Sequence, residues 1–161
     1  MNARQLKAAF YFREEVYSSD KKHPIEAGFV SEIIWTLSGS GKKKTAGLIT
    51  SRNRECKTEP IPCRHIHFKK EKPEHPYRQK TPNDHSLRII DAFMNVMTVV
   101  AAVPGYTPVI GVIKEIVYWK DPKGIVRCSA VLDDRAASGK STYRARIKYV
   151  FLEDAYKEKG C

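Results

Sequence analysis

The sequence predicts an α+β fold, built as a tandem duplication of one unit that consists of a helix plus a three-stranded antiparallel sheet. Two observations support this prediction. Segments with apolar residues at helical spacing are followed by segments rich in β-branched and aromatic residues, and this order occurs twice. The two occurrences also match at a constant offset of 83 positions. With 161 residues, 42% of them hydrophobic, the chain is long enough to form a sizeable core.

The first repeat is expected to begin with a helix over residues 4–17, where apolar side chains recur at helical spacing. Pro24 ends this region, and Gly39 and Gly41 mark a turn between two strands. The three strands are expected at residues 29–37, 45–50 and 63–68.

The second repeat follows a segment with three prolines, residues 71–83, which predicts a linker. Asn83 or Asp84 is expected to cap a helix that Pro104 stops. The buried stripe of this helix is predicted to contain Ile89, Ile90, Phe93, Val96, Met97 and Val100. Its strands are expected at residues 109–119, 125–132 and 143–151. The repeats, at about 1–70 and 84–156, are expected to form a single compact domain over residues 1–161.

The match between the repeats is clearest in eight consecutive positions, GFVSEIIW from Gly28 and GVIKEIVY from Gly111. The same register, without a gap, pairs Gly41 with Gly124 in the predicted turns. Strands share a restricted set of residue types, so short matches arise by chance. One unbroken register through helix, strand, turn and strand favours a duplication.

Positive charge is concentrated in one part of the chain. The formal net charge is +11, and residues 42–80 hold twelve basic and four acidic residues. Such a local field attracts phosphates, acidic proteins or anionic surfaces, although a solvated loop is the alternative interpretation. A nucleic acid or another polyanion is therefore one predicted partner, and its candidate contacts also include a basic run in the last predicted strand. These candidates are Lys42, Lys43, Lys44, Arg52, Arg54, Arg64, Lys69, Lys70, Arg144, Arg146 and Lys148.

A Cys-Arg-His-Ile-His run gives weak candidate metal ligands in Cys63, His65 and His67. On a strand, alternate residues share a face, so the two imidazoles could bind zinc or the metal of a rolling-circle type nuclease, with Tyr77 as its nucleophile. Two exposed histidines on a basic strand are the alternative. No nucleophile–base–acid set is recognisable elsewhere, so we predict a protein that is not an enzyme and has no cofactor.

The location of the protein in the cell is weakly indicated. No apolar segment approaches the about 20 residues that a membrane-spanning helix needs. Residues 1–13 lack a signal-peptide pattern, which favours the cytoplasm, whereas a secreted protein is expected if Met1 replaces a cleaved signal. The four cysteines are expected to be free thiols, with two disulfides as the alternative.

Several short segments resemble latexin and its relatives. In the second repeat they are DHSLRII from Asp84, the stretch that ends in Trp119 and Lys120, Ala137-Ser138, Arg146-Ile147 and Val150. In the first repeat they are Ala3-Arg4, Phe10 and Phe12-Arg13.

The resemblance implies two cystatin-like halves and a protein partner that is a zinc metallocarboxypeptidase, which the family inhibits. The loop before the last strand helps to plug the enzyme's cleft in that family. The matching residues here are Ala137, Ser138, Gly139, Lys140, Ser141 and Thr142, and Gly139 stands where the family presents a polar contact. The Gln-x-Val-x-Gly hairpin with which cystatins inhibit papain-type proteases is absent.

Overall fold

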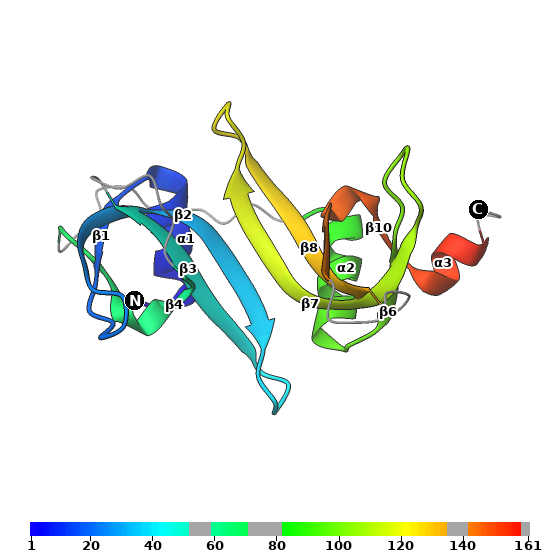
Figure 1. Ribbon diagram of the computed structural model, residues 1–161, viewed down its shortest axis with the longest axis horizontal. Coiled ribbons are helices and arrows are strands. Elements are labelled where there is room, and N and C mark those ends of the chain that lie inside the picture. Colours follow the sequence, from blue (N-terminus) through cyan, green and yellow to red (C-terminus); the bar gives the residue numbers. More distant parts are fainter. Residues whose placement is uncertain (52–58, 71–81, 135–141, 159–161) are drawn as a thin grey trace. The chain divides into compact units, whose positions relative to one another are not determined.

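Helices and antiparallel strands are combined in the computed structural model, which describes residues 1–51, 59–70, 82–134 and 142–158 (Figure 1). This mixture confirms the α+β class. The chain forms two compact units, each assembled from three stretches. Unit 1 consists of Met1–Trp35, Lys44–Gln79 and Tyr118–Val126, and unit 2 of Thr36–Lys43, Lys80–Val117 and Arg127–Cys161.

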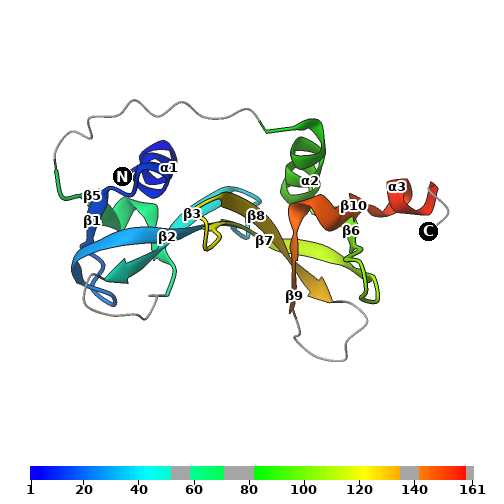
Figure 2. The ribbon, with the colours of Figure 1, turned by 90° about the horizontal axis from the view of Figure 1, so that it is seen from above.

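In its described residues, unit 1 has one α-helix, and its strands lie in the order β5-β1-β2-β3-β4. The elements are α1 (Ala3–Phe12), β1 (Glu15–Ser18), β2 (Ile25–Leu37), β3 (Lys43–Ser51), β4 (Ile61–Pro62), the 3-10 helix η1 (Cys63–His65) and β5 (Ile66–Phe68). Helix α1 lies on one side of the strands (Figure 2). Its buried side chains pack with those of the strands in a core that contains Leu6, Phe10, Val16, Ile33, Ile49, Ile61 and Ile66.

Unit 2 repeats this sequence of elements, with strand order β10-β6-β7-β8-β9. The elements are α2 (Asp84–Met94), β6 (Thr98–Ala101), β7 (Val109–Lys120), β8 (Val126–Asp134), β9 (Thr142–Arg146), the 3-10 helix η2 (Ile147–Tyr149) and β10 (Val150–Leu152). One further helix, α3 (Glu153–Glu158), follows. The core includes Ile89, Phe93, Val99, Ile113, Ile116, Leu132 and Val150. As predicted, Asn83 caps α2, because its side chain accepts a hydrogen bond from the Ser86 N–H at 2.8 Å.

Both main helices end earlier than predicted, at equivalent residues. Arg13 and Val96 are 83 positions apart and adopt left-handed backbone conformations, with φ of 51° and 55°. The next N–H groups, of Glu14 and Met97, donate back to the carbonyls five residues earlier, at 3.0 and 2.9 Å. These bonds are typical of a Schellman helix end, which usually contains glycine. The predicted helix at residues 13–17 and the stripe residues beyond the helix were therefore wrong: Val96 and Met97 are exposed, and Val100 lies in β6.

The residues that follow the two helix ends form two strands that were not predicted, β1 and β6. Strand β1 pairs with β2 and with β5, and β6 pairs with β7 and with β10. The segments 63–68 and 143–151 were predicted as single strands. The first begins with a 3-10 helix and the second contains one, and in each the strand after this helix pairs with β1 or β6. Within the described residues, each half of the chain thus has five strands instead of the predicted three.

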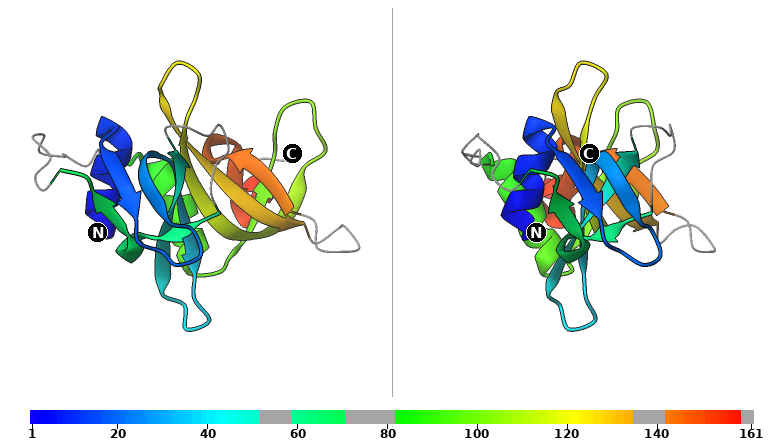
Figure 3. Two further views of the ribbon diagram at one scale, coloured as in Figure 1. Left: turned by 60° about the vertical axis from the view of Figure 1, so that its left-hand side comes forward. Right: turned by 90° about the vertical axis from the view of Figure 1, so that its left-hand side faces the viewer.

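The long hairpins β2–β3 and β7–β8 are twisted, and their turns are alike (Figure 3). In each turn the residue that starts it donates an N–H to the carbonyl four residues later, from Ser38 at 2.8 Å and from Asp121 at 2.9 Å. Gly41 and Gly124 both have φ of 78°. A three-residue loop that ends in a left-handed glycine is a common hairpin connection, as the glycine pattern predicted.

Gly28 and Gly111 allow close approaches between neighbouring strands at equivalent positions. A Cβ atom on Gly28 would lie 2.6 Å from the Thr50 carbonyl oxygen, and one on Gly111 would lie 1.9 Å from that of Asp133. Thr50 and Asp133 are again 83 positions apart. These glycines are therefore required by packing of backbone on backbone.

Candidate functional site

Strands β5, β1 and β2 of unit 1 present a surface that we call the outer face, formed by Glu15, Tyr17, Phe29, His67 and Lys69. Glu15 is paired with Phe29, and Tyr17 with His67, so each pair shares one side of the sheet. The backbone N–H of Lys69 donates to the Glu15 carbonyl at 3.0 Å, which extends the first pair by one strand. Tyr17 is 37% exposed, whereas Val16 between Glu15 and Tyr17 is fully buried.

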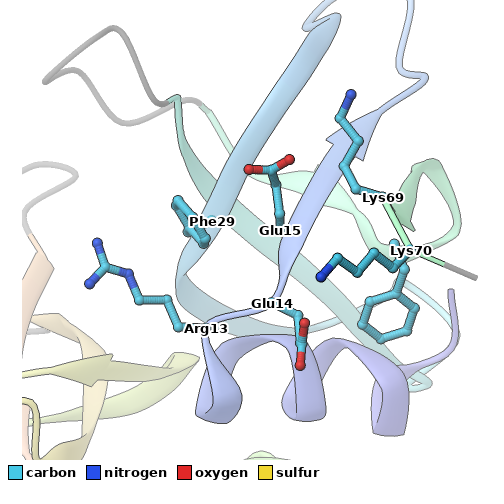
Figure 4. Close-up of a pocket in the computed structure, with 7 residues that line it drawn as sticks. Arg13, Glu14, Glu15, Phe29, Lys69 and Lys70 are labelled. Carbon is cyan, nitrogen blue, oxygen red and sulfur yellow. The ribbon is translucent and has the colours of Figure 1, made fainter. Parts of the chain in front are cut away.

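A pocket of about 370 Å³ opens at the end of this face (Figure 4). It is lined by Arg13, Glu14, Glu15, Phe29, Phe68, Lys69 and Lys70. The guanidinium carbon of Arg13 lies 5.0 Å from the centre of the Phe29 ring, a cation–π distance. Figure 4 shows Arg13 and Lys70 on opposite sides, with Glu15 between Phe29 and Lys69.

A second hollow of about 550 Å³ continues along the outer face from Lys69. Tyr17, Ser18, Pro24, Ile25, Glu26 and Lys69 line it. Because Lys69 lines both hollows, the cationic pocket and the exposed ring of Tyr17 belong to one surface.

The equivalent positions of unit 2 have different chemistry. The pairs Val16–Phe68 and Val99–Leu152 occupy matching places in the two sheets, which fixes the equivalence of the following residues. The pocket residues of unit 1, in chain order, correspond to Val96, Met97, Thr98, Val112, Leu152, Glu153 and Asp154. Two acidic residues therefore stand where unit 1 has two lysines, and aliphatic residues stand where it has Arg13 and two phenylalanines.

Helix α3 packs against the corresponding face of unit 2, beside β6 and β10. Val100, the equivalent of Tyr17, is only 1% exposed. Phe151, which is paired with Val100, has its ring 6.5 Å from that of Tyr156 in α3. One unit therefore buries this face, while the other leaves its aromatic side chain accessible.

The two candidate metal-binding histidines lie at one end of the outer face. His67 Nε2 is 2.9 Å from Ser19 Oγ, and its ring stacks on Tyr17 at 4.9 Å. His65 lies in η1, so the strand alternation that predicted a shared face does not apply to it. Cys63 is a free, half-buried thiol. Within the described ranges, no three His, Cys, Asp or Glu side chains are grouped to hold a metal.

The pKa of His67 is lowered by burial, and further by the positive charges of the amino terminus and His65. The unfolded chain therefore takes up a proton near pH 6.5 that the folded chain binds only at lower pH. We expect stability to fall as the pH drops from 7 to 5, and His67→Asn to reduce this loss. Urea denaturation of both proteins at the two pH values measures it, with pH 8 as the control. An equal loss in both proteins would contradict the assignment.

Lys120 is a basic residue of unit 1 that sequence reasoning did not single out. Its ammonium donates a hydrogen bond to the Phe10 carbonyl in the last turn of α1 and lies 4.8 Å from the Phe10 ring centre. Burial, and secondarily the charge of Arg13, lower the pKa of Lys120. Lysine at a helix C-terminus satisfies carbonyl groups that have no partner within the helix, so this contact stabilises α1.

The predicted polyanion contacts are dispersed over several elements. Lys69 and Lys70 line the pocket, together with Arg13, which was not predicted. The supposed basic strand is interrupted, since Arg144 and Arg146 lie in β9 and Lys148 in η2. Of the others, Lys42 follows the hairpin turn, Lys43 and Lys44 are in β3, and Arg64 is in η1. Arg52 and Arg54 fall outside the described residues.

The predicted inhibitory loop is almost entirely outside the described residues, since only Thr142, the exposed first residue of β9, is described. Cys128 forms no disulfide with any described residue, and Cys56 and Cys161 lie outside the described residues. None of the helices in the described ranges is long and apolar enough to cross a membrane. No protein-family model, curated protein or solved structure matches the chain.

Proposed function

We propose that this protein is a non-enzymatic binding protein whose unit 1 binds single-stranded nucleic acid on its outer face and in the adjoining pocket. The observation that carries the proposal is the difference between the units. The same sequence of elements presents cations and aromatic rings in unit 1. In unit 2 it presents aliphatic residues, followed by two acidic residues in the first turn of α3.

The chemistry of the pocket fits such a ligand. Proteins that bind single strands combine a basic groove, which follows the phosphates, with aromatic rings on which bases stack. Arg13, Lys69 and Lys70 are exposed cations within one pocket, and Phe29 and Phe68 supply half-buried rings beside them. Tyr17 offers a further exposed ring along the same face.

Unit 2 indicates that the fold does not require these side chains. The helix end at Val96 has the same backbone conformation as that at Arg13 without a charge. The chain continues after β10 with Glu153 and Asp154, where unit 1 has lysines after β5. Because the scaffold forms without them, a ligand is the best explanation for the basic and aromatic residues of unit 1.

The finer fold assignment is also a proposal. The equivalent helix ends, turns and glycines support a duplication of one unit, whereas the cystatin-like arrangement is not confirmed. The order β5-β1-β2-β3-β4, with a 3-10 helix before a last strand that pairs with the first, is that of SH3-like barrels. Such barrels serve many functions, so the order by itself indicates none.

Inhibition of a metallocarboxypeptidase through residues 137–142 stays a prediction. Its test is direct: the purified protein in excess should inhibit a carboxypeptidase A-type enzyme, and full activity under those conditions would exclude it.

The nucleic-acid proposal is tested by fluorescence anisotropy with labelled single-stranded oligonucleotides over a range of salt concentrations. If three cations neutralise phosphates, the slope of log K against log salt should be about −2. Heparin, which has anionic groups but no bases, should compete poorly at equal charge. Undetectable binding at low salt, salt-independent binding, or equal affinity for heparin would overturn the proposal.

A further inference from the structure

We infer that helix α2 of unit 2 associates with α2 of a second copy of this chain, in an antiparallel arrangement related by a two-fold axis. The starting point is a second apolar stripe on this helix. Helix α2 lies on one side of the strands of unit 2, and its buried side contains Ile89 and Phe93 (Figure 2). Leu87 and Met94 do not belong to that side, since they are 46% and 37% exposed although both are large and apolar.

The spacing of this second stripe is that of a contact between helices. Leu87, Ile90 and Met94 are separated by three and then by four residues, so their side chains form one row along the helix. Ile90 is half-buried, at the edge of the stripe. Directly after the helix, Val96 and Met97 add two further exposed apolar side chains. Exposed apolar side chains grouped in this way are typical of a protein interaction surface.

Unit 1 indicates that the fold does not require the stripe. The equivalent positions of α1 hold Arg4, Lys7 and Tyr11. The ammonium of Lys7 lies 4.9 Å from the centre of the Trp35 ring, so α1 uses this position for a contact within its own unit. A partner that covers α2 therefore explains the apolar residues of unit 2 better than helix stability does.

The charges beside the stripe favour a second copy as this partner. Arg88 and Asp91 are exposed, have opposite charges and lie on one flank of α2, three residues apart. Arg88 forms no ion pair with any described residue, and the Asp91 carboxylate accepts through Oδ1 from the Asn95 amide at 3.0 Å. The equivalent residues of α1 are Gln5 and Ala8, so the charge pair is present only where the apolar stripe is.

A two-fold axis turns this pair into two reciprocal contacts. Antiparallel helices related by such an axis meet along the same flank, and a residue of one copy lies opposite a residue at the mirrored position of the other. If the axis crosses α2 between residues 89 and 90, Arg88 of each copy lies opposite Asp91 of the other. The two apolar stripes then face each other. Such a contact is self-complementary and closed, so it produces a dimer and no filament.

Sedimentation equilibrium of the purified chain measures this association. The helix has eleven residues, so the contact is small and a dissociation constant on the order of 100 μM is expected. Between about 10 μM and about 1 mM, the average mass should rise from that of the monomer toward twice that value. A mass that stays at the monomer value over this range, including the case in which α2 binds only a different protein, would overturn the inference.

A charge exchange tests the arrangement. Arg88→Asp and Asp91→Arg, each alone, should weaken the dimer about tenfold, because both reciprocal contacts become repulsive. The two changes together restore opposite charges and should recover association to within about threefold. Lys123→Asp changes the charge as Arg88→Asp does, at another exposed residue, and should leave association unchanged. Unaltered association in the single variants, or no recovery in the double variant, would contradict the assignment.

Two further variants test the stripe and exclude bridging by nucleic acid. Leu87→Arg should abolish the dimer and should fold, since α1 has Arg4 at this position, and circular dichroism verifies folding. Lys69→Glu with Lys70→Asp, which changes the pocket of unit 1, should dimerise normally. A dimer that persists in Leu87→Arg, or that is lost in the double lysine variant, would overturn the inference. The nucleic-acid proposal depends on unit 1 alone and stands or fails separately.

Discussion

Replacing Gly111 with alanine is expected to lower the free energy of unfolding by about 3 kcal/mol, the upper part of the range for overpacked sites. The new Cβ would lie 1.9 Å from the Asp133 carbonyl oxygen, which is backbone and cannot rotate away. Strands β7 and β8 would have to move apart. Urea denaturation followed by circular dichroism measures the effect as a shift of the midpoint.

Gly47→Ala is the matched control, because Gly47 is also a buried strand glycine. The nearest atoms to its new Cβ would be Cδ1 of Ile66 at 2.9 Å and Cδ1 of Leu6 at 3.3 Å, the ends of flexible side chains. Unit 2 has Ala130 at the equivalent position. We expect a cost of about 1 kcal/mol or less. Equal costs for the two alanines would mean that the close contact at Gly111 does not constrain the sheet.

The double substitution Lys69→Glu, Lys70→Asp is expected to weaken binding of single-stranded oligonucleotides on the order of 100-fold at low salt. It gives unit 1 the residues that unit 2 has at the equivalent positions, so the fold should be unchanged. Two phosphate contacts are lost and two repulsive charges are added. Anisotropy titrations should also give a shallower salt dependence, since fewer counterions are released.

Lys123→Glu with Lys157→Asp makes the same change in net charge at two exposed residues that do not line the pocket. At about 0.15 M salt, where the Debye length is about 8 Å, we expect this variant to retain binding within about threefold, because neither lysine lines the pocket. If both double variants weaken binding equally, total charge rather than the pocket determines affinity, and the site is misassigned.

The sequence allowed the class, the start of α2 and the hairpin turns to be predicted, because capping residues and glycine patterns act locally. The sequence did not reveal where the helices end. Arg13 and Val96 adopt the left-handed backbone conformation that ends a helix, and this position is usually recognised by a glycine. Apolar residues at 16 and 100 continued the helical spacing, so two short strands were assigned to helices.

The candidate site was predicted only in part. Lys69 and Lys70 were identified by local charge, a property that composition shows directly. Arg13 and Phe29 lie far from them in the chain and join them only because β1 pairs with both β2 and β5. Strand pairing of this kind is set by tertiary packing, and no local pattern in one sequence reports it.

The division of the chain into units has a consequence for the history of the protein. The residues of each hairpin turn belong to the unit that is otherwise formed by the other half of the chain. In unit 1, Lys120 from the second half contacts Phe10, and Tyr118 contacts Trp35. If the two halves arose by the proposed duplication, a single ancestral copy would have lacked such a contribution, unless two copies exchanged turns as a swapped homodimer. Fusion of the genes would have made that exchange intramolecular and independent of concentration.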